Sequence, residues 1–187
     1  MADQDHSIYV LLTDTGTWFT KVIGLYTKAN WNHASIAFDA ELRDVYSFGR
    51  KHPANPLSGG FVKENLHTGI LFQSASCAIY RCPVSQSQYN RIRECIRMFE
   101  QNRDIYKYNL LGLIGLMLNI AYERKNAFFC TQFVAMVMGN SGIPLSEKPY
   151  PFVTPVDILN SRVLQPVYQG SLQTYVNKEA ADVLMYG

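Results

Sequence analysis

The hydrophobic and polar positions divide the chain into a first half rich in predicted strands and a second half rich in predicted helices. Ser7–Thr13 is apolar and β-branched and has the length of a buried strand. Apolar residues at helical spacing predict a helix over Thr17–Tyr26. Further strands are predicted at His33–Asp39, Val45–Phe48, Gly69–Phe72 and Ser76–Cys82.

The second half carries helical periodicity and helix-capping residues. Ser85–Gln88 resembles a capping box and precedes an apolar stripe that ends at Phe99. Asn109–Tyr122 is apolar nearly all round, which predicts a deeply buried helix. We also expect a helix over Cys130–Met138, ended by Gly139 and Asn140, a short helix opening at Thr154–Pro155, and loops at Pro53–Gly60 and Pro144–Pro155. This order predicts an α+β fold in a single domain spanning residues 1–187.

Composition narrows the function classes. Hydrophobic residues make up 48% of the 187 residues and charged residues 17%, which is enough apolar material for a core. The net charge of +2 lacks the concentrated basic stripe of a nucleic-acid-binding domain, so no nucleic acid partner is expected. The N-terminus has no basic segment before its apolar run, and the apolar run Leu110–Ile120 is too short to span a bilayer. We therefore expect a cytoplasmic protein with four free thiols and neither metal nor cofactor.

Cys130 lies where a predicted apolar helix begins. A thiol at a helix N-terminus meets the positive end of the helix dipole and several unpaired N–H groups, which favour the thiolate and would hold an oxyanion. A small buried thiol without chemistry is the alternative. Thr131 and Gln132, both polar within an apolar segment, favour the catalytic interpretation. Cys77, Cys82 and Cys95 are expected to be packing residues.

A cysteine nucleophile needs a base and a third group that orients the base. Among the four histidines, only His33 begins a predicted strand, and the face that it shares with Ser35 and Ala37 carries small or polar residues. If Tyr46 and Phe48 point into the core, Ser47 lies beside His33 and its hydroxyl accepts from the imidazole. Glu64 is an alternative orienting acid, ranked slightly below Ser47.

Three segments together resemble the circularly permuted branch of the papain-like NlpC-type superfamily, which includes YiiX-like bacterial proteins and, more distantly, lecithin retinol acyltransferase. They are Trp31–Asp39, Val45–Lys51 and Phe128–Val134. His33 precedes Cys130 by 97 positions, which is the permuted order. The resemblance implies a papain-like antiparallel sheet packed against helices, with Cys130 as nucleophile, His33 as base and Ser47 in the third position. Ser47 departs from the His, Glu, Asn or Gln that the family more often has there.

The resemblance implies acyl transfer through a thioester, with amide or isopeptide cleavage of a small peptide-like substrate as the expected reaction. Some relatives place a tyrosine near the oxyanion, and Tyr106 or Tyr108 would match that position. Two alternatives stay open. One is a lipid-directed thiol acyltransferase or esterase, with the apolar stretch Leu110–Ile120 lining an acyl pocket; the other is a non-catalytic binding module on the same fold. The sequence leaves the oligomeric state undetermined.

Overall fold

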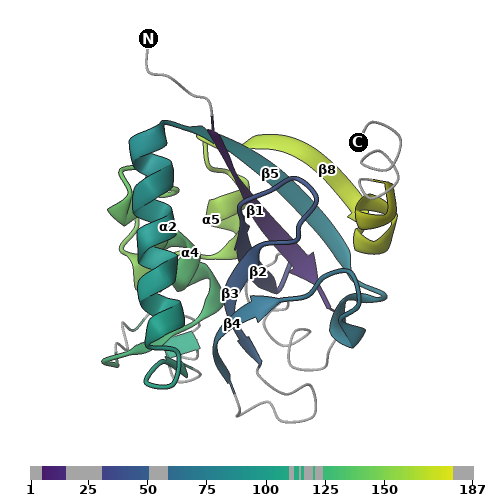
Figure 1. Ribbon diagram of the computed structural model, residues 1–187. Helices are drawn as coiled ribbons and strands as arrows, with labels where there is room; N and C mark the ends of the chain where they lie inside the picture. Colours follow the sequence, from purple (N-terminus) through teal and green to yellow (C-terminus); the bar gives the residue numbers. More distant parts are fainter. Residues whose placement is uncertain are drawn as a thin grey trace.

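A six-stranded antiparallel sheet with helices on both faces forms the molecule (Figure 1). The computed structural model describes residues 6–15, 31–50, 59–109, 112–113, 115, 120 and 124–178. The strand order is β4-β3-β2-β1-β5-β8. The strands are β1 (His6–Asp14), β2 (His33–Ala37), β3 (Val45–Arg50), β4 (Gly59–Glu64), β5 (Ser76–Val84) and β8 (Gln165–Ser171). This arrangement confirms the α+β fold class.

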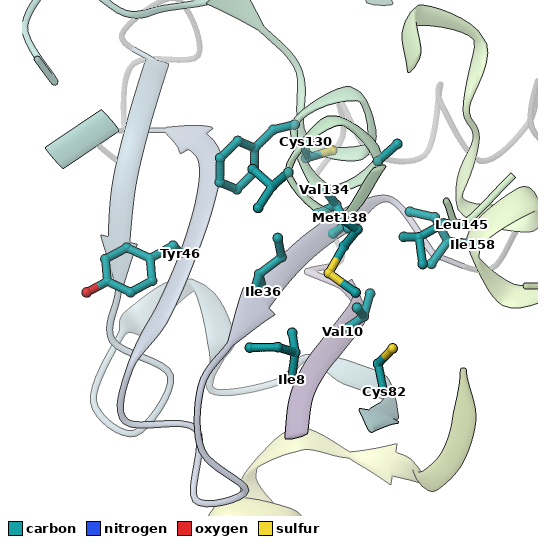
Figure 2. Packing of buried hydrophobic residues seen from close by; sticks show 14 of the residues in the cluster. Ile8, Val10, Ile36, Tyr46, Cys82, Cys130, Val134, Met138, Leu145 and Ile158 are labelled. Carbon is teal, nitrogen blue, oxygen red and sulfur yellow. The ribbon is translucent and has the colours of Figure 1, made fainter. Parts of the chain in front are cut away.

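Helices α2 (Gln86–Gln101), α4 (Cys130–Asn140) and α5 (Pro155–Leu159) lie on one face of the sheet. Their buried side chains share one core with alternate residues of the strands, among them Ile8, Val10 and Ile36. Figure 2 shows Val134 and Met138 of α4 lying over Ile36 and Val10, with Cys130 on the same helix. The alternation predicted for His33–Asp39 is confirmed, because Ala34, Ile36 and Phe38 all enter this core.

The other face of the sheet is covered as well. Leu11, Ala37 and Val45 pack there against Leu66 and against the helical residues 172–178. The sheet face that carries His33 therefore packs into a second, smaller hydrophobic core over most of its area. Among the described residues of this face, buried polar side chains such as Ser35 and Ser47 lie near His33 at the start of β2.

Local capping chemistry explains the helix boundaries. Ser85 and Gln88 form the predicted capping box of α2, and Thr154 and Asp157 form a second capping box at the start of α5. Helix α4 continues through Gly139 and Asn140, two residues past the predicted end, and Gly142 with φ of +83° follows it. The second capping box shows why a helix begins directly after Thr154.

Several predictions from the sequence were wrong. Residues Gly69–Phe72 do not form a strand: Ile70–Phe72 is a 3-10 turn (η1). It follows a turn in which the Asn65 side chain accepts from the backbone N–H groups of His67 and Thr68. Gly59 and Gly60, assigned to a loop, begin β4. The edge strand β8 was not predicted because its exposed residues and Pro166 break the alternation that marks a buried strand.

The remaining elements are short or lie partly outside the described residues. Strands β6 (Lys107–Tyr108) and β7 (Ala127–Phe128) pair in parallel, and η2 (Tyr150–Phe152) lies within the predicted loop Pro144–Pro155. The predicted helix Thr17–Tyr26 lies outside the described residues, as does Pro53–Ser58. Of Asn109–Tyr122, Leu113 is buried as predicted, whereas Ile120 is exposed. No helix in the described part of the chain has the length and apolarity needed to cross a membrane.

Candidate active site

The first turn of α4 fixes the position of Cys130. The preceding residue, Phe129, is fully buried and has the extended backbone of an N-cap, and Cys130 is the first helical residue. No side-chain hydrogen bond caps this helix start, in contrast to α2 and α5. By helix geometry, the first N–H groups have no acceptor within the helix. Cys130 is thus placed beside free donors, as its position in the sequence predicted.

His33 begins β2 and contacts two other polar groups of the site. Its Nε2 atom lies 2.6 Å from Oε1 of Glu64, and the Cys130 side chain lies close enough to help raise the pKa of the imidazole. The imidazole therefore links a thiol from α4 to a carboxylate from β4.

Glu64, at the end of β4, holds its carboxylate among three donors. Ser47 Oγ donates to Oε1 over 2.6 Å, and Ser35 Oγ donates to Oε2 over 2.7 Å. The third partner is the imidazole of His33. The Glu64 side chain is only 6% exposed and that of His33 15%. A buried carboxylate needs such partners, because burying an unpaired charge is costly.

Charge and burial shift the pKa values of His33 and Glu64 in opposite directions. Burial by itself lowers the pKa of His33, but the Glu64 carboxylate and the contact with Cys130 outweigh it and raise that pKa from 6.5 to about 10. Burial by itself raises the pKa of Glu64, yet His33 and the hydroxyls of Ser47 and Ser35 lower it below its usual value. At neutral pH the pair is therefore an imidazolium facing a carboxylate.

The structure corrects the predicted role of Ser47. Tyr46 and Phe48 are buried in the helix-side core, as expected, and Ser47 lies on the His33 side of the sheet. Its hydroxyl, however, donates to Glu64, and Glu64 occupies the position at the imidazole that was assigned to Ser47. The physical reason is reach: the longer Glu64 side chain extends from β4 across β3, where it meets both groups.

A glycine leaves room for the imidazole. Gly49 lies on β3, two residues after Ser47, and a Cβ atom added there would lie 3.4 Å from His33 Cε1 and 3.3 Å from Ser47 Oγ. The separation from Ser47 Oγ is tighter than ordinary van der Waals contact, and the separation from His33 Cε1 is at its lower limit. A glycine at the end of a predicted strand signals a close approach by another group, and this signal could have identified Gly49 from the sequence.

Two other polar residues at the start of α4 have different surroundings. Thr131 is buried and donates to the backbone carbonyl of Val153 over 2.6 Å, so it anchors the helix start to the segment before α5. This hydrogen bond gives the polarity of Thr131 a structural explanation, so Thr131 does not by itself indicate catalysis. Gln132 is also buried, and its side-chain oxygen has no hydrogen-bond partner in the structure.

The tyrosines proposed to assist an oxyanion lie in aromatic packing. Tyr106 packs against Phe99, with ring centroids 4.5 Å apart, and also against Phe48 and Phe128. The Tyr108 side chain packs beside Gly59 at the start of β4. These contacts account for Tyr106 as a packing residue.

The other candidate residues lie elsewhere. Among the described histidines, His6 contacts Gln86 and stacks on Tyr89, and His67 contacts the carbonyl of Glu41; His52 lies outside the described residues. Cys77, Cys82 and Cys95 are free, and burial raises the pKa of each thiol, to about 12 for Cys77 and about 11 for Cys82. Among the described residues, no group of three or more His, Cys, Asp or Glu side chains is arranged to hold a metal ion.

Comparison with known proteins adds no relative. No protein-family model matches the chain, and no curated protein matches it in sequence. The chemistry of the site therefore has to be derived from the positions of Cys130, His33 and Glu64.

Proposed function

We propose that this chain is a cysteine-dependent hydrolase in which Cys130 is the nucleophile, His33 the acid and base, and Glu64 the residue that orients His33. The observation that carries the proposal is the bridging position of His33, whose ring contacts both the Cys130 side chain and the Glu64 carboxylate. A nucleophile, a base and an orienting third group within hydrogen-bond reach are what thiol catalysis requires.

The reaction we propose follows from these positions. An imidazolium beside a sulfur favours the thiolate, which attacks the substrate carbonyl and forms a tetrahedral oxyanion. The uncapped N–H groups at the start of α4 lie next to the sulfur and would stabilise that oxyanion. His33 then gives its proton to the leaving amine or alcohol, and a thioester forms on Cys130. Neutral His33 then takes a proton from water as the water attacks the thioester. The C–S bond breaks, the acyl group leaves as a carboxylic acid, and the thiolate and imidazolium of the starting state are restored.

We further propose that the chain belongs to the permuted papain-like branch that its motifs resemble, and that it cleaves an amide or isopeptide bond. The antiparallel sheet, with the histidine on an early strand and the cysteine opening a later helix, supports this proposal. Glu64 strengthens it, because a glutamate is one of the residues that the family more often has in the third position.

Acylation by small esters tests the proposed function. Wild-type protein is treated with p-nitrophenyl esters that carry an acetyl, an aminoacyl or a long-chain acyl group, and the acylated residue is located by mass spectrometry. We expect a transient thioester on Cys130 that is absent from Cys130→Ala and strongly reduced in His33→Gln. Cys95→Ala is the matched control and should behave like wild type.

The outcomes separate the alternatives. Preference for the aminoacyl ester supports the amidase, and preference for the long-chain ester favours the lipid-directed enzyme. Acylation of a different cysteine, or equal acylation of Cys130 in wild type and His33→Gln, would contradict the proposal and favour a non-catalytic module.

A further inference from the structure

The Glu64 carboxylate receives more hydrogen bonds than orientation of one imidazole requires. Ser47 Oγ and His33 Nε2 both lie 2.6 Å from Oε1, and Ser35 Oγ lies 2.7 Å from Oε2. Both serines are at most 1% exposed. Their hydroxyls therefore have no alternative partner in bulk water, and each donates its proton to the carboxylate.

The sheet register explains how three strands supply these groups. Ser35 lies on β2, Ser47 on β3 and Glu64 on β4, and the strands are consecutive neighbours in the sheet. Strand neighbours lie about 4.8 Å apart, so a carboxylate at β4 reaches β2 only by crossing over β3. Small side chains on β3 leave that path open, and the serine hydroxyls hold the carboxylate along it.

We infer that Ser35 and Ser47 are positioning residues that fix the Glu64 carboxylate in its ionised form and in the one orientation that reaches His33. The inference rests on the proposed function, since Glu64 acts through His33 on Cys130. Two hydroxyl donors disperse the negative charge and restrict rotation of the carboxylate, so that Oε1 stays directed at Nε2. Neither serine contacts the sulfur in this arrangement, and neither is assigned a chemical step.

The charged groups around Glu64 are few in the described part of the chain. His33 of β2 faces it, and Cys130 of α4 lies behind the imidazole. On β4 itself, the neighbouring Lys63 pairs with Asp44 instead, with Nζ 2.7 Å from Oδ1. Among the side chains of β3 that the structure describes, the Ser47 hydroxyl is the one that donates to the carboxylate. Without the two serine hydroxyls, His33 is therefore the main remaining group that stabilises the negative charge of Glu64.

The test follows the titration of Glu64 by carbon-13 NMR of its side-chain carboxyl in wild type, Ser35→Ala, Ser47→Ala and the double variant. Removing either hydroxyl should raise the titration midpoint of Glu64 by about one pH unit. The reason is that losing a hydrogen bond to a charged group costs about as much free energy as a shift of one pKa unit. Thr13→Val is the matched control. Thr13 pairs with His33 across β1 and β2, and its buried hydroxyl has no partner in the structure, so this variant should titrate like wild type.

Alkylation of Cys130 by iodoacetamide at neutral pH is the second readout. We expect the serine variants to react several-fold more slowly than wild type and Thr13→Val to react normally. An unchanged Glu64 midpoint in both folded single variants would overturn the inference, even if the double variant does not fold. If the Glu64 midpoint is unchanged but acylation of Cys130 still depends on His33, the positioning role of the serines is wrong and the proposed function is not. Failure of the inference can therefore be distinguished from failure of the proposed function.

Discussion

Nε2 of His33 lies 2.6 Å from Oε1 of Glu64, although β3 separates their strands in the sheet. The contact is therefore not a neighbouring cross-strand pair: the glutamate reaches over β3, and the small residues Ser47 and Gly49 leave space for the pair. This one contact keeps the ring of His33 oriented, and the same ring contacts Cys130. The predictions below depend on this arrangement.

Removing the orienting carboxylate should slow chemistry at Cys130. In Glu64→Gln the imidazole loses its anionic partner, so we expect at least about a tenfold lower rate of Cys130 acylation, as found for third-group changes in catalytic triads. His33→Ala should cost about a hundredfold or more, because it removes the acid and base itself. Stopped-flow measurement of p-nitrophenol release checks both.

His67→Ala is the matched control for the second variant, since His67 contacts the carbonyl of Glu41 and lies outside the site. A Glu64→Gln protein with wild-type kinetics would show that the carboxylate does not act through His33.

The His33–Glu64 pair should make stability depend on pH. The pKa of His33 is raised from 6.5 to about 10, so its contribution is fully present below pH 6.5 and is lost as the pH rises toward about 10. The pKa of Glu64 is lowered below 4.5, so its contribution is present above pH 4.5 and is lost as the pH falls further. The pair therefore stabilises most between about pH 4.5 and 6.5.

Urea unfolding of wild type and Glu64→Gln at several pH values measures this effect. The difference in their free energies of unfolding should be largest near pH 5.5 and shrink steadily toward pH 10. Glu94→Gln is the control, because Glu94 pairs with Arg97 on the exposed surface and should give a small, flat difference. A difference that grows with pH would contradict the assigned charges.

A side chain at Gly49 should disturb the site more than the fold. The added Cβ would press on His33 Cε1 and Ser47 Oγ, and the larger side chain of Gly49→Val would displace the imidazole. We expect Cys130 alkylation to fall several-fold in Gly49→Val and less in Gly49→Ala, with both variants still folded by circular dichroism. Equal alkylation rates in all three proteins would show that the imidazole does not need this space.

Thiol labelling of the native protein should be selective. Burial raises the pKa of the Cys77, Cys82 and Cys95 thiols, which keeps them protonated and slow at neutral pH. Cys130 lies beside His33, so iodoacetamide should modify Cys130 first, and all four cysteines should react only after unfolding. Peptide mapping after brief labelling measures this order. Faster labelling of Cys95 than of Cys130 would contradict activation of Cys130.

Local sequence patterns predict the two elements that carry Cys130 and His33. Alternation in His33–Asp39 and the apolar residues after Cys130 predict the strand and helix correctly, because these patterns follow from which face of each element is buried. The capping box at Ser85 likewise predicts the start of α2 from local hydrogen bonds alone. The sequence identifies Cys130 and His33 as candidates because each lies at the start of one of these elements, and in the structure the two side chains lie close together.

The group that contacts the imidazole of His33 opposite Cys130 is set by tertiary packing. The sequence left both Ser47 and Glu64 open as the orienting group, with Ser47 placed on the His33 side by strand alternation and Glu64 as the alternative acid. The choice depends on how far a side chain reaches across a twisted sheet, and β4 was not predicted as a strand. Strand pairing is a long-range property, whereas periodicity is local, so the register that places Glu64 over Ser47 and beside His33 is set by the packed sheet as a whole.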